Sequence, residues 1–201
     1  MNVLWRTLIT MLRARLIRRR EGTVPLDSVT RIRLRVLPTD IDLLRHMNNG
    51  RYLSLFDLGR WDMTTRTGLG DAFREHGWYA VVANETITFR KSLGPFQRFT
   101  VETKWIGHDD RALYMEHRAV VDGEVYARAV IRARILRRAG GSVTHEELFG
   151  ALGFTGELPE APAWAHDWSE ATRLPSTRKP APSVWEQQTD PHRGIFPSAS
   201  S

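Results

Sequence analysis

Four strand-like runs follow one another without an intervening helix, and this feature constrains the fold of the chain more than any other. The runs occupy residues 79–90, 96–106, 112–121 and 124–136. Asp122-Gly123 between the last two is a strong β-hairpin signal. In the last run the small Ala127 and Ala129 share a face with larger aliphatic residues, which leaves room for a helix to lie against that face. We therefore expect a meander of antiparallel strands with a helix packed on it.

One strand and one long helix are expected before the four runs. Residues 31–36 alternate arginine with aliphatic residues, which is the period of a strand with one buried face. A helix over residues 49–67 would place five residues on one side: Tyr52, Leu55, Phe56, Gly59 and Met63. Gly68 and Gly70 are expected to stop this helix, and residues 71–77 to form a loop. Gly59 costs about 1 kcal/mol of helix propensity, so it indicates close packing on a sheet. This element order predicts an α+β fold.

The length of 201 residues and the 41% hydrophobic content suit one domain with extensions. We divide the chain into a basic amphipathic N-terminal segment, residues 1–22, a central domain, residues 23–140, and a C-terminal extension, residues 141–201. Gly140-Gly141 marks the end of the domain. The extension should contain a short helix at 144–152, followed by an irregular stretch rich in Pro, Trp and Ser that packs through its tryptophans or stays partly disordered.

Composition excludes several kinds of chemistry. The chain has no cysteine, which rules out disulfides, a cysteine nucleophile and cysteine-bound zinc, and favours a cytoplasmic location. Arginine supplies most of the net charge of +6. The strand arginines alternate with buried positions, so they form a solvated face and predict no nucleic-acid partner. The sequence also lacks a G-x-S-x-G elbow, an H-E-x-x-H zinc motif and a phosphate-binding P-loop.

The first twenty residues have aliphatic residues and Trp5 at near-helical spacing, interleaved with arginine and without an acidic residue. Arg6 and Arg13 interrupt the apolar run well short of the roughly 20 residues of a membrane span, and no signal-peptide cleavage site follows. Two interpretations stay open. The helix lies on an anionic membrane surface with Trp5 inserted, or it docks on the protein's own body or on a second subunit.

The loop before the long helix carries the residues best suited to chemistry. Residues 40–52 read DIDLLRHMNNGRY, which delivers an acid and an imidazole to a helix N-terminus. Such a terminus presents unpaired N–H groups and a positive dipole end that stabilise negative charge on a carbonyl oxygen. The alternative is that Asn48 or Asn49 only caps the helix while the Asp and His side chains satisfy the loop backbone.

Asp42, His46, Asn48, Asn49 and Tyr52 resemble the D-x-x-x-H-x-N-N-x-x-Y signature of hotdog-fold acyl-CoA thioesterases of the 4-hydroxybenzoyl-CoA type. The resemblance covers about residues 29–138 and implies a hotdog fold, in which an antiparallel sheet is wrapped around one long helix. It also implies hydrolysis of an acyl thioester, for which we expect a medium- or long-chain acyl-CoA.

The resemblance implies roles for individual residues. Asp42 is the expected base or nucleophile, with His46 beside it, and the oxyanion and substrate-binding positions are Asn49, Gly50, Arg51 and Tyr52. Arg90 and Lys91 are expected to hold the phosphates of coenzyme A, although a plain solvated turn explains them equally well. No metal and no cofactor are expected, because coenzyme A is part of the substrate. Asp40 is expected to be structural, and Asp57 on the helix to be solvated or capping.

The aromatic residues Phe56, Trp61, Trp78, Tyr79 and Phe89 are candidates for an acyl pocket or for ordinary core. The resemblance also implies a homo-oligomer, a dimer or tetramer. The rival prediction is a non-catalytic, membrane-associated protein of the same fold that binds acyl-CoA or lipid. Leu44 favours the rival, because related acyl-carrier-protein thioesterases carry an asparagine there. Under either prediction we expect a cytoplasmic location, with peripheral contact at the inner face of a membrane if the N-terminal helix lies on lipid.

Overall fold

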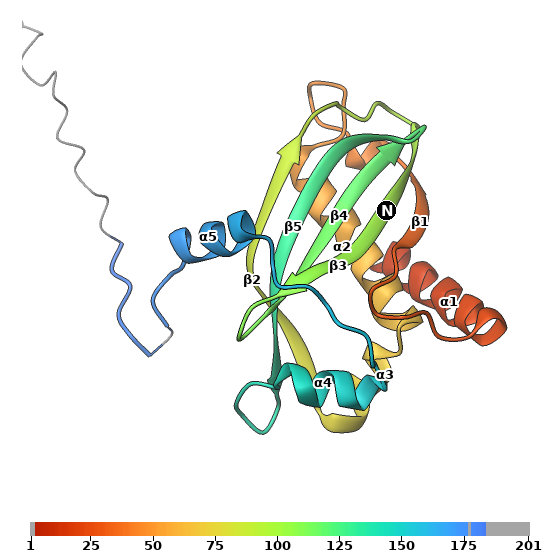
Figure 1. Cartoon of the computed structure of the whole chain (residues 1–201). Helices are drawn as coiled ribbons and strands as arrows, with labels where there is room; N and C mark the ends of the chain where they lie inside the picture. The colour runs from red at the N-terminus through yellow and green to blue at the C-terminus, as the bar shows by residue number, and fades with distance from the viewer. Residues whose placement is uncertain (1–2, 177, 184–201) are drawn as a thin grey trace, which may run out of the picture.

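The computed structural model describes residues 3–176 and 178–183. The expected elements that fall on residues 1–2, 177 and 184–201 lie outside this range. The described residues form five helices, one 3-10 turn and five strands, and Figure 1 shows how the helices and strands are arranged. In chain order they are α1 (Val3–Glu21), β1 (Thr30–Arg35), η1 (Pro38–Asp40), α2 (Asn49–Arg66), α3 (Leu69–His76), β2 (Trp78–Phe89), β3 (Arg98–His108), β4 (Leu113–Val121), β5 (Glu124–Arg137), α4 (His145–Leu152) and α5 (Ala163–Ala171).

The strands form one antiparallel sheet in the order β1-β3-β4-β5-β2. All four runs expected after the long helix are strands, with ends that differ by one or two residues. Asp122 and Gly123 form the turn between β4 and β5 with φ values of 48° and 83°. Two central residues with positive φ are typical of the tight hairpin turn that matches the twist of antiparallel strands.

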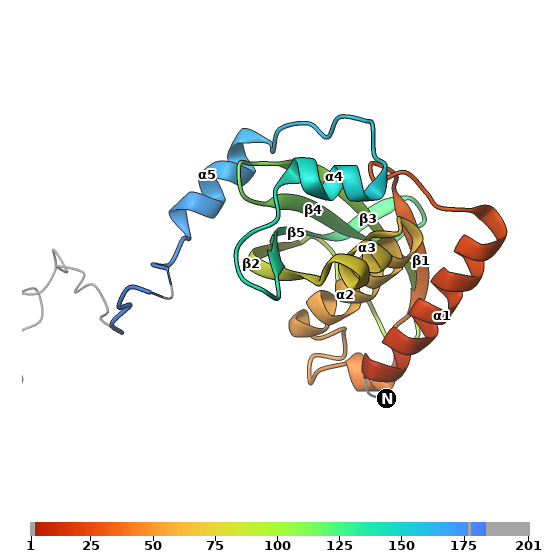
Figure 2. The ribbon, with the colours of Figure 1, turned by 90° about the horizontal axis from the view of Figure 1, so that it is seen from below.

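Helix α2 lies against one face of the sheet, which curves around it (Figure 2). All five residues expected on one side of this helix face the interior, and their side chains are almost fully buried. Gly59 makes the closest approach: a Cβ built there would lie 2.4 Å from Thr103 Oγ1 and 2.8 Å from Val101 Cγ1. The sheet wrapped around one long helix confirms the predicted α+β hotdog fold.

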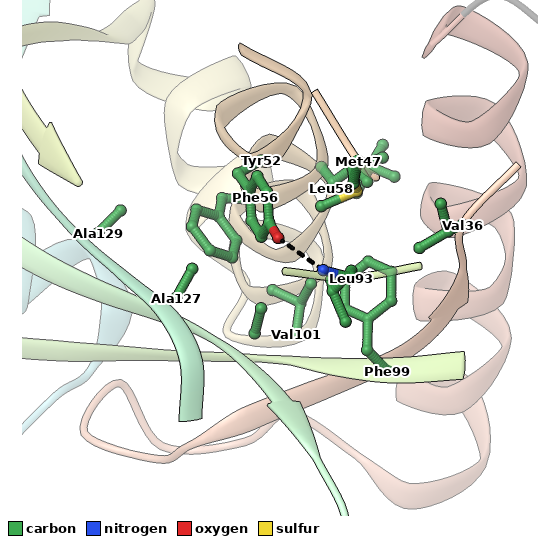
Figure 3. Packing of buried hydrophobic residues seen from close by; sticks show 12 residues of the cluster. Val36, Met47, Tyr52, Phe56, Leu58, Leu93, Phe99, Val101, Ala127 and Ala129 are labelled. Atoms are coloured by element: carbon green, nitrogen blue, oxygen red, sulfur yellow. Dashed lines mark hydrogen bonds between the residues drawn. The ribbon is translucent and has the colours of Figure 1, made fainter. Parts of the chain in front are cut away.

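The core between α2 and the sheet is mostly apolar (Figure 3), and it also encloses the Tyr52 hydroxyl and the buried side chains of Thr103 and His117. Ala127 and Ala129 of β5 leave the space that Phe56 occupies, as the pattern of small residues predicted. Beneath Gly59, His117 Nδ1 lies 2.9 Å from Thr103 Oγ1. Burial lowers the pKa of His117 to about 3, so its imidazole is neutral at physiological pH and packs as part of the core.

The expected loop over residues 71–77 is wrong, because Leu69–His76 form helix α3. Gly68, with φ 81°, ends α2 and starts the new helix, and Gly70 lies inside α3 instead of stopping α2. Leu69 and Ala72 are spaced for one helical face and both are buried. Leu69 belongs to a second apolar cluster, which includes Met63, Trp78, Trp105 and Leu148. Tertiary burial of this short face stabilises a helix that is too short to be stable alone.

The segment after β5 packs on the domain. Leu148 of α4 is buried in the second apolar cluster. Helix α5 crosses the outer face of the sheet beside β2 (Figure 1), where Trp164 stacks on Arg128, with the guanidinium carbon 5.3 Å from the ring centroid. The buried Ser169 of α5 makes a 3.0 Å hydrogen bond with the Tyr114 hydroxyl. Packing through a tryptophan is thus one part of how α5 is held on the sheet.

Candidate functional site

A tight turn brings Asp42 and His46 side by side just before α2. The Asp42 N–H donates to the His46 carbonyl at 3.0 Å, and the Arg45 N–H donates to the Asp42 carbonyl at 3.0 Å. Ile41 and Met47 form an isolated antiparallel bridge at the base of the turn. Arg45 adopts a left-handed conformation with φ 61°. These backbone bonds hold the two side chains on the same side of the chain.

The Asp42 and His46 side chains lie within ion-pairing distance. His46 Nδ1 is 3.6 Å from Asp42 Oδ2, which is longer than a hydrogen bond. Asp42 Oδ1 accepts the Leu44 N–H at 2.9 Å, so the loop backbone engages one carboxylate oxygen and the other faces the imidazole. Both side chains are partly open to solvent, at 23% for Asp42 and 30% for His46. A substrate can therefore reach either one.

The N-terminus of α2 is capped by Asn48. Asn48 Oδ1 accepts the Gly50 N–H at 2.9 Å, and its carbonyl accepts the Arg51 N–H at 2.9 Å. Asn48, Asn49 and Gly50 are all exposed. Arg51 donates from Nη2 to the Thr39 carbonyl at 3.1 Å and braces η1 against the helix. The cap that the sequence offered as an alternative to chemistry is present, and it uses an exposed amide oxygen.

Tyr52 is a core residue and not part of the surface. Its side chain is 2% exposed, and its hydroxyl accepts the Leu93 N–H at 3.3 Å (Figure 3). Burial raises the pKa of Tyr52, and the Leu93 hydrogen bond opposes this shift. The Met47 N–H donates to the Leu93 carbonyl at 2.8 Å. Tyr52 and Met47 therefore fasten the loop around Leu93 to the loop that carries Asp42 and His46.

Arg90 and Lys91 lie at the start of the loop around Leu93. Both side chains bind one carboxylate: Arg90 Nη1 is 2.7 Å from Glu124 Oε1, and Lys91 Nζ is 2.5 Å from Glu124 Oε2. The two cations are about half exposed. A phosphate would have to compete with Glu124 or bind to the outward side of the pair.

A second set of charged residues, which the sequence analysis did not predict as a group, lies further along α2. Asp57 Oδ1 is 2.8 Å from Arg60 Nη2. Burial raises the pKa of Asp57, and the Arg60 charge opposes the rise. Burial, followed by repulsion from Asp57, also raises the pKa of Glu85 on β2. Glu85 had no sequence signal, because it is one polar residue in a strand and only the fold places it near Asp57.

An apolar cavity of about 230 Å³ opens beside Arg60. Three of the five aromatic candidates line it, namely Trp61, Trp78 and Tyr79. The other two do not: Phe56 is fully buried in the core, and Phe89 packs edge-on against Tyr52 with ring centroids 5.2 Å apart. The residues that line the cavity do not include Asp42 or His46, so one chain alone does not join the cavity to the loop.

Asp40 has a structural role, as the sequence suggested. It is 4% exposed, accepts the Leu37 N–H at 2.9 Å and pairs with Arg6 Nη1 of α1 at 2.7 Å. Over the described residues, no three His, Asp or Glu side chains gather in a way that would bind a metal ion.

Comparison with known proteins agrees with this architecture. Residues 36–171 match the model of the thioesterase-like superfamily, which is well over half of the chain. The chain therefore belongs to this superfamily, and its fold is that of the hotdog thioesterases. The matched region includes α4 and α5.

Curated relatives include Protein THEM6 from several animals. The frog protein (Xenopus laevis) is 40% identical over 99 residues, which is 49% of this chain and 48% of the relative. The fruit-fly protein (Drosophila melanogaster) is 29% identical over 143 residues, 69% of this chain and 71% of the relative. The match thus spans about half the length of the frog relative.

Solved structures share the fold at low identity. The probable thioesterase YbaW of Escherichia coli superimposes with a TM-score of 0.57 at 21% identity, covering 61% of this chain and 95% of that one. The Staphylococcus aureus protein SAV2348, solved in complex with CoA, gives a TM-score of 0.58 at 15% identity, covering 76% and 99% of the two chains. Among the described residues, no helix is both long and apolar enough to span a membrane.

Proposed function

We propose that the protein is an acyl-CoA thioesterase that hydrolyses a medium- or long-chain acyl thioester to a free acid and a thiol. The observation that carries the proposal is the placement of Asp42 and His46 3.6 Å apart at the start of α2. Membership of the thioesterase-like superfamily supports the reaction class.

In the proposed reaction, Asp42 acts on the thioester carbonyl carbon directly or removes a proton from the attacking water. If Asp42 attacks, its carboxylate oxygen forms an anhydride with the acyl group as the carbon–sulfur bond breaks, and water then cleaves the anhydride to release the acid and restore Asp42. If Asp42 is the base, the water oxygen bonds to the carbonyl carbon, the carbon–sulfur bond breaks, and the proton taken up by Asp42 passes to the leaving thiolate. In both routes one water supplies the hydroxyl of the acid and the proton of the thiol. His46 orients the free Asp42 Oδ2 or hydrogen-bonds to the substrate. Either role for Asp42 requires negative charge on the carbonyl oxygen to be stabilised nearby.

The α2 N-terminus is the proposed oxyanion site. The side-chain amide oxygen of Asn48 lies 2.9 Å from the Gly50 nitrogen, which is the distance and chemistry expected for a bound carbonyl oxygen. Rotation of the exposed Asn48 side chain would free the Gly50 N–H for the substrate. Gly50 also matters sterically, since a Cβ there would lie 3.3 Å from Asn48 Oδ1. Asn49 and Arg51 flank this position, whereas Tyr52 supports it from within the core.

The remaining substrate contacts are proposed at a pair of basic residues and at an apolar cavity. Arg90 and Lys91 are the proposed partners for the coenzyme A phosphates, which is consistent with the CoA complex of the related fold. The cavity lined by Trp61, Trp78 and Tyr79 is a proposed acyl site. No cofactor beyond the coenzyme A of the substrate is proposed, and a cytoplasmic location stays a prediction of the sequence.

We also propose a homo-oligomer, a dimer or tetramer, as the family resemblance implies. Strand β2 is one edge of the sheet, and three of its large apolar residues, Tyr79, Val82 and Phe89, are between 39% and 41% exposed. An edge strand with exposed apolar residues is suited to pairing with another chain. A partner there is our explanation for the separation of the cavity from Asp42 within one chain.

Thiol release from a panel of acyl-CoA chain lengths tests the function. Asp42→Ala should lower kcat by at least about a hundredfold, because base or nucleophile roles contribute that much or more. Asp57→Ala removes another partly exposed carboxylate of the same region and should cost less. His46→Ala should fall between them. Turnover by Asp42→Ala at the wild-type rate would refute the assignment.

The rival is a non-catalytic protein that binds acyl-CoA or lipid at a membrane. The observation that favours it is the engagement of the Gly50 N–H by Asn48, together with the apolar Leu44, which is 75% exposed. Tight acyl-CoA binding by calorimetry, with no thiol release at any chain length, would establish the rival.

A further inference from the structure

Helix α1 presents its apolar side to solvent. Five of its large residues, Trp5, Leu8, Ile9, Leu12 and Leu16, are between 51% and 62% exposed. They recur at three- and four-residue spacing and therefore share one face. We name these five residues the outer stripe. A continuous row of exposed apolar side chains in a soluble fold indicates a surface that another partner covers.

The inward side of α1 carries two polar residues and one alanine, and it packs on the domain. Its buried residues are Arg6, Thr10 and Ala14. Arg6 is 8% exposed, pairs with the buried Asp40 at 2.7 Å and donates to the Arg35 carbonyl at 3.1 Å. Turning the helix to bury the outer stripe would break this buried pair, which leaves an uncompensated charge. The helix is thus held with its apolar face outward.

Arginines accompany the outer stripe. Arg15 and Arg19 follow Leu12 and Leu16 by three residues, so they lie on the same face. Arg13 and Arg20 follow Ile9 and Leu16 by four residues and border that face. All four arginines are exposed, and residues 3–20 contain no acidic side chain. The surface therefore combines apolar residues with positive charge.

We propose that the outer stripe and its arginines dock on the surface of an anionic lipid bilayer. Figure 2 shows α1 along the side of the molecule, outside the layers of α2 and the sheet, where its outer face is open. The apolar side chains enter the boundary of the acyl chains, and the long arginine side chains extend back to lipid phosphates. The proposal does not depend on the role of Asp42.

Charge complementarity favours lipid over a second copy of the chain. Two copies that paired through this face would offer no acidic side chain to Arg15 and Arg19, because residues 3–20 contain none, and the arginines would be buried without a counter-charge. An anionic bilayer supplies the opposite charge to every arginine and a wet boundary for their head groups.

Vesicle co-sedimentation of the full chain tests the proposal. We expect binding to vesicles of equimolar phosphatidylcholine and phosphatidylserine, little binding to phosphatidylcholine alone, and a decline with added salt. The double variant Leu8→Gln/Leu12→Gln should lose binding. Leu174→Gln, which changes a leucine 80% exposed outside α1, is the matched control and should bind as wild type does.

A second variant separates charge from apolar contact. Arg15→Gln/Arg19→Gln should reduce the partition coefficient about 25-fold, since each basic residue near the surface contributes about 1 kcal/mol, or roughly a factor of five. No binding of the wild type to the anionic vesicles, or unchanged binding by the leucine variant, would overturn the proposal. A further pair of results would overturn the proposal in favour of a second copy. The wild type would not bind vesicles, and analytical ultracentrifugation would show an oligomer that the leucine variant has lost.

Discussion

The two long helices of this protein bury opposite kinds of residue. Helix α2 buries mostly large apolar side chains against the sheet, and Leu55 and Phe56 are at most 1% exposed. Helix α1 instead buries Arg6, Thr10 and Ala14 and leaves its outer stripe in solvent. Burial of large apolar side chains stabilises α2. Helix α1 is attached by ion pairs and hydrogen bonds and by the smaller apolar contacts of Val3 and Ala14. Each of the two helices therefore buries the face whose side chains find matching partners on the neighbouring surface.

The contact between the two helices also contains a charged group from α2. Asp62 is 2% exposed, and its Oδ2 has no hydrogen-bond partner and lies 3.8 Å from Arg66 Nη1. It faces a cavity of about 450 Å³ that Arg6, Thr10 and Arg13 of α1 also line. Burial raises the pKa of Asp62 to about 6, and the charges of Arg66 and Arg13 oppose the rise.

The largest contrast is expected from the same substitution on each helix. Leu55→Ala in α2 should lower the free energy of unfolding by about 3 kcal/mol, because it empties a buried site. Leu12→Ala in α1, where the leucine is 57% exposed, should change it by less than about 0.5 kcal/mol. Urea denaturation without lipid measures both. Equal losses would show that the outer stripe is covered in solution.

The close approach of α2 to the sheet predicts the next effect. Gly59→Ala should destabilise the fold by about 2 kcal/mol, because the added methyl group displaces Thr103 and Val101 and costs more than helix propensity returns. Gly150→Ala in α4 meets nothing within 4 Å and should be neutral or slightly stabilising. Thermal denaturation compares the two variants, and a Gly59→Ala protein as stable as wild type would disprove the close contact.

The buried carboxyl group of Asp62 on α2 predicts that the free energy of unfolding depends on pH. Its folded pKa of about 6 exceeds its usual 3.8, so the folded state binds the proton more tightly. The resulting stabilisation is full below pH 3.8 and disappears as the pH rises through 6, at a cost of about 3 kcal/mol. Asp62→Asn should lack this decline in urea denaturation between pH 4 and pH 7. If the free energies of unfolding of the two proteins changed with pH in the same way, the raised pKa of Asp62 would be excluded.

The smallest effect is expected at the end of α1. Arg18 pairs with Asp71 and donates to the Thr65 carbonyl at 3.3 Å, but both charged side chains are partly exposed. Arg18→Ala should therefore cost no more than about 1 kcal/mol. Arg19→Ala, one residue further on the exposed side, is the control and should cost nearly nothing. A loss at Arg18 as large as that at Leu55 would mean that polar contacts hold α1 as firmly as apolar burial holds α2.

Sequence patterns predicted the strands and α2 well, because alternating burial and an apolar stripe are local signals. They missed α3, since a helix of eight residues is stabilised by its burial of Leu69 and Ala72 and not by its own pattern. At the candidate site, the spacing of Asp42 and His46 drew attention to the loop. The apolar stripe already placed Tyr52 on the buried side of α2, but no pattern revealed that Glu124 holds Arg90 and Lys91 or that Glu85 approaches Asp57.

Neighbouring residues alone predicted the antiparallel strands, the long helix and the loop before it, because periodicity and glycine turns are local signals. The resemblance of that loop to a family motif implied the hotdog fold. The tertiary structure decided which way α1 faces. Its composition allowed either face to be buried, and the choice depended on Asp40, a residue 34 positions away that pairs with Arg6. Contacts between distant residues depend on the whole fold, so no local pattern could have predicted the exposed outer stripe.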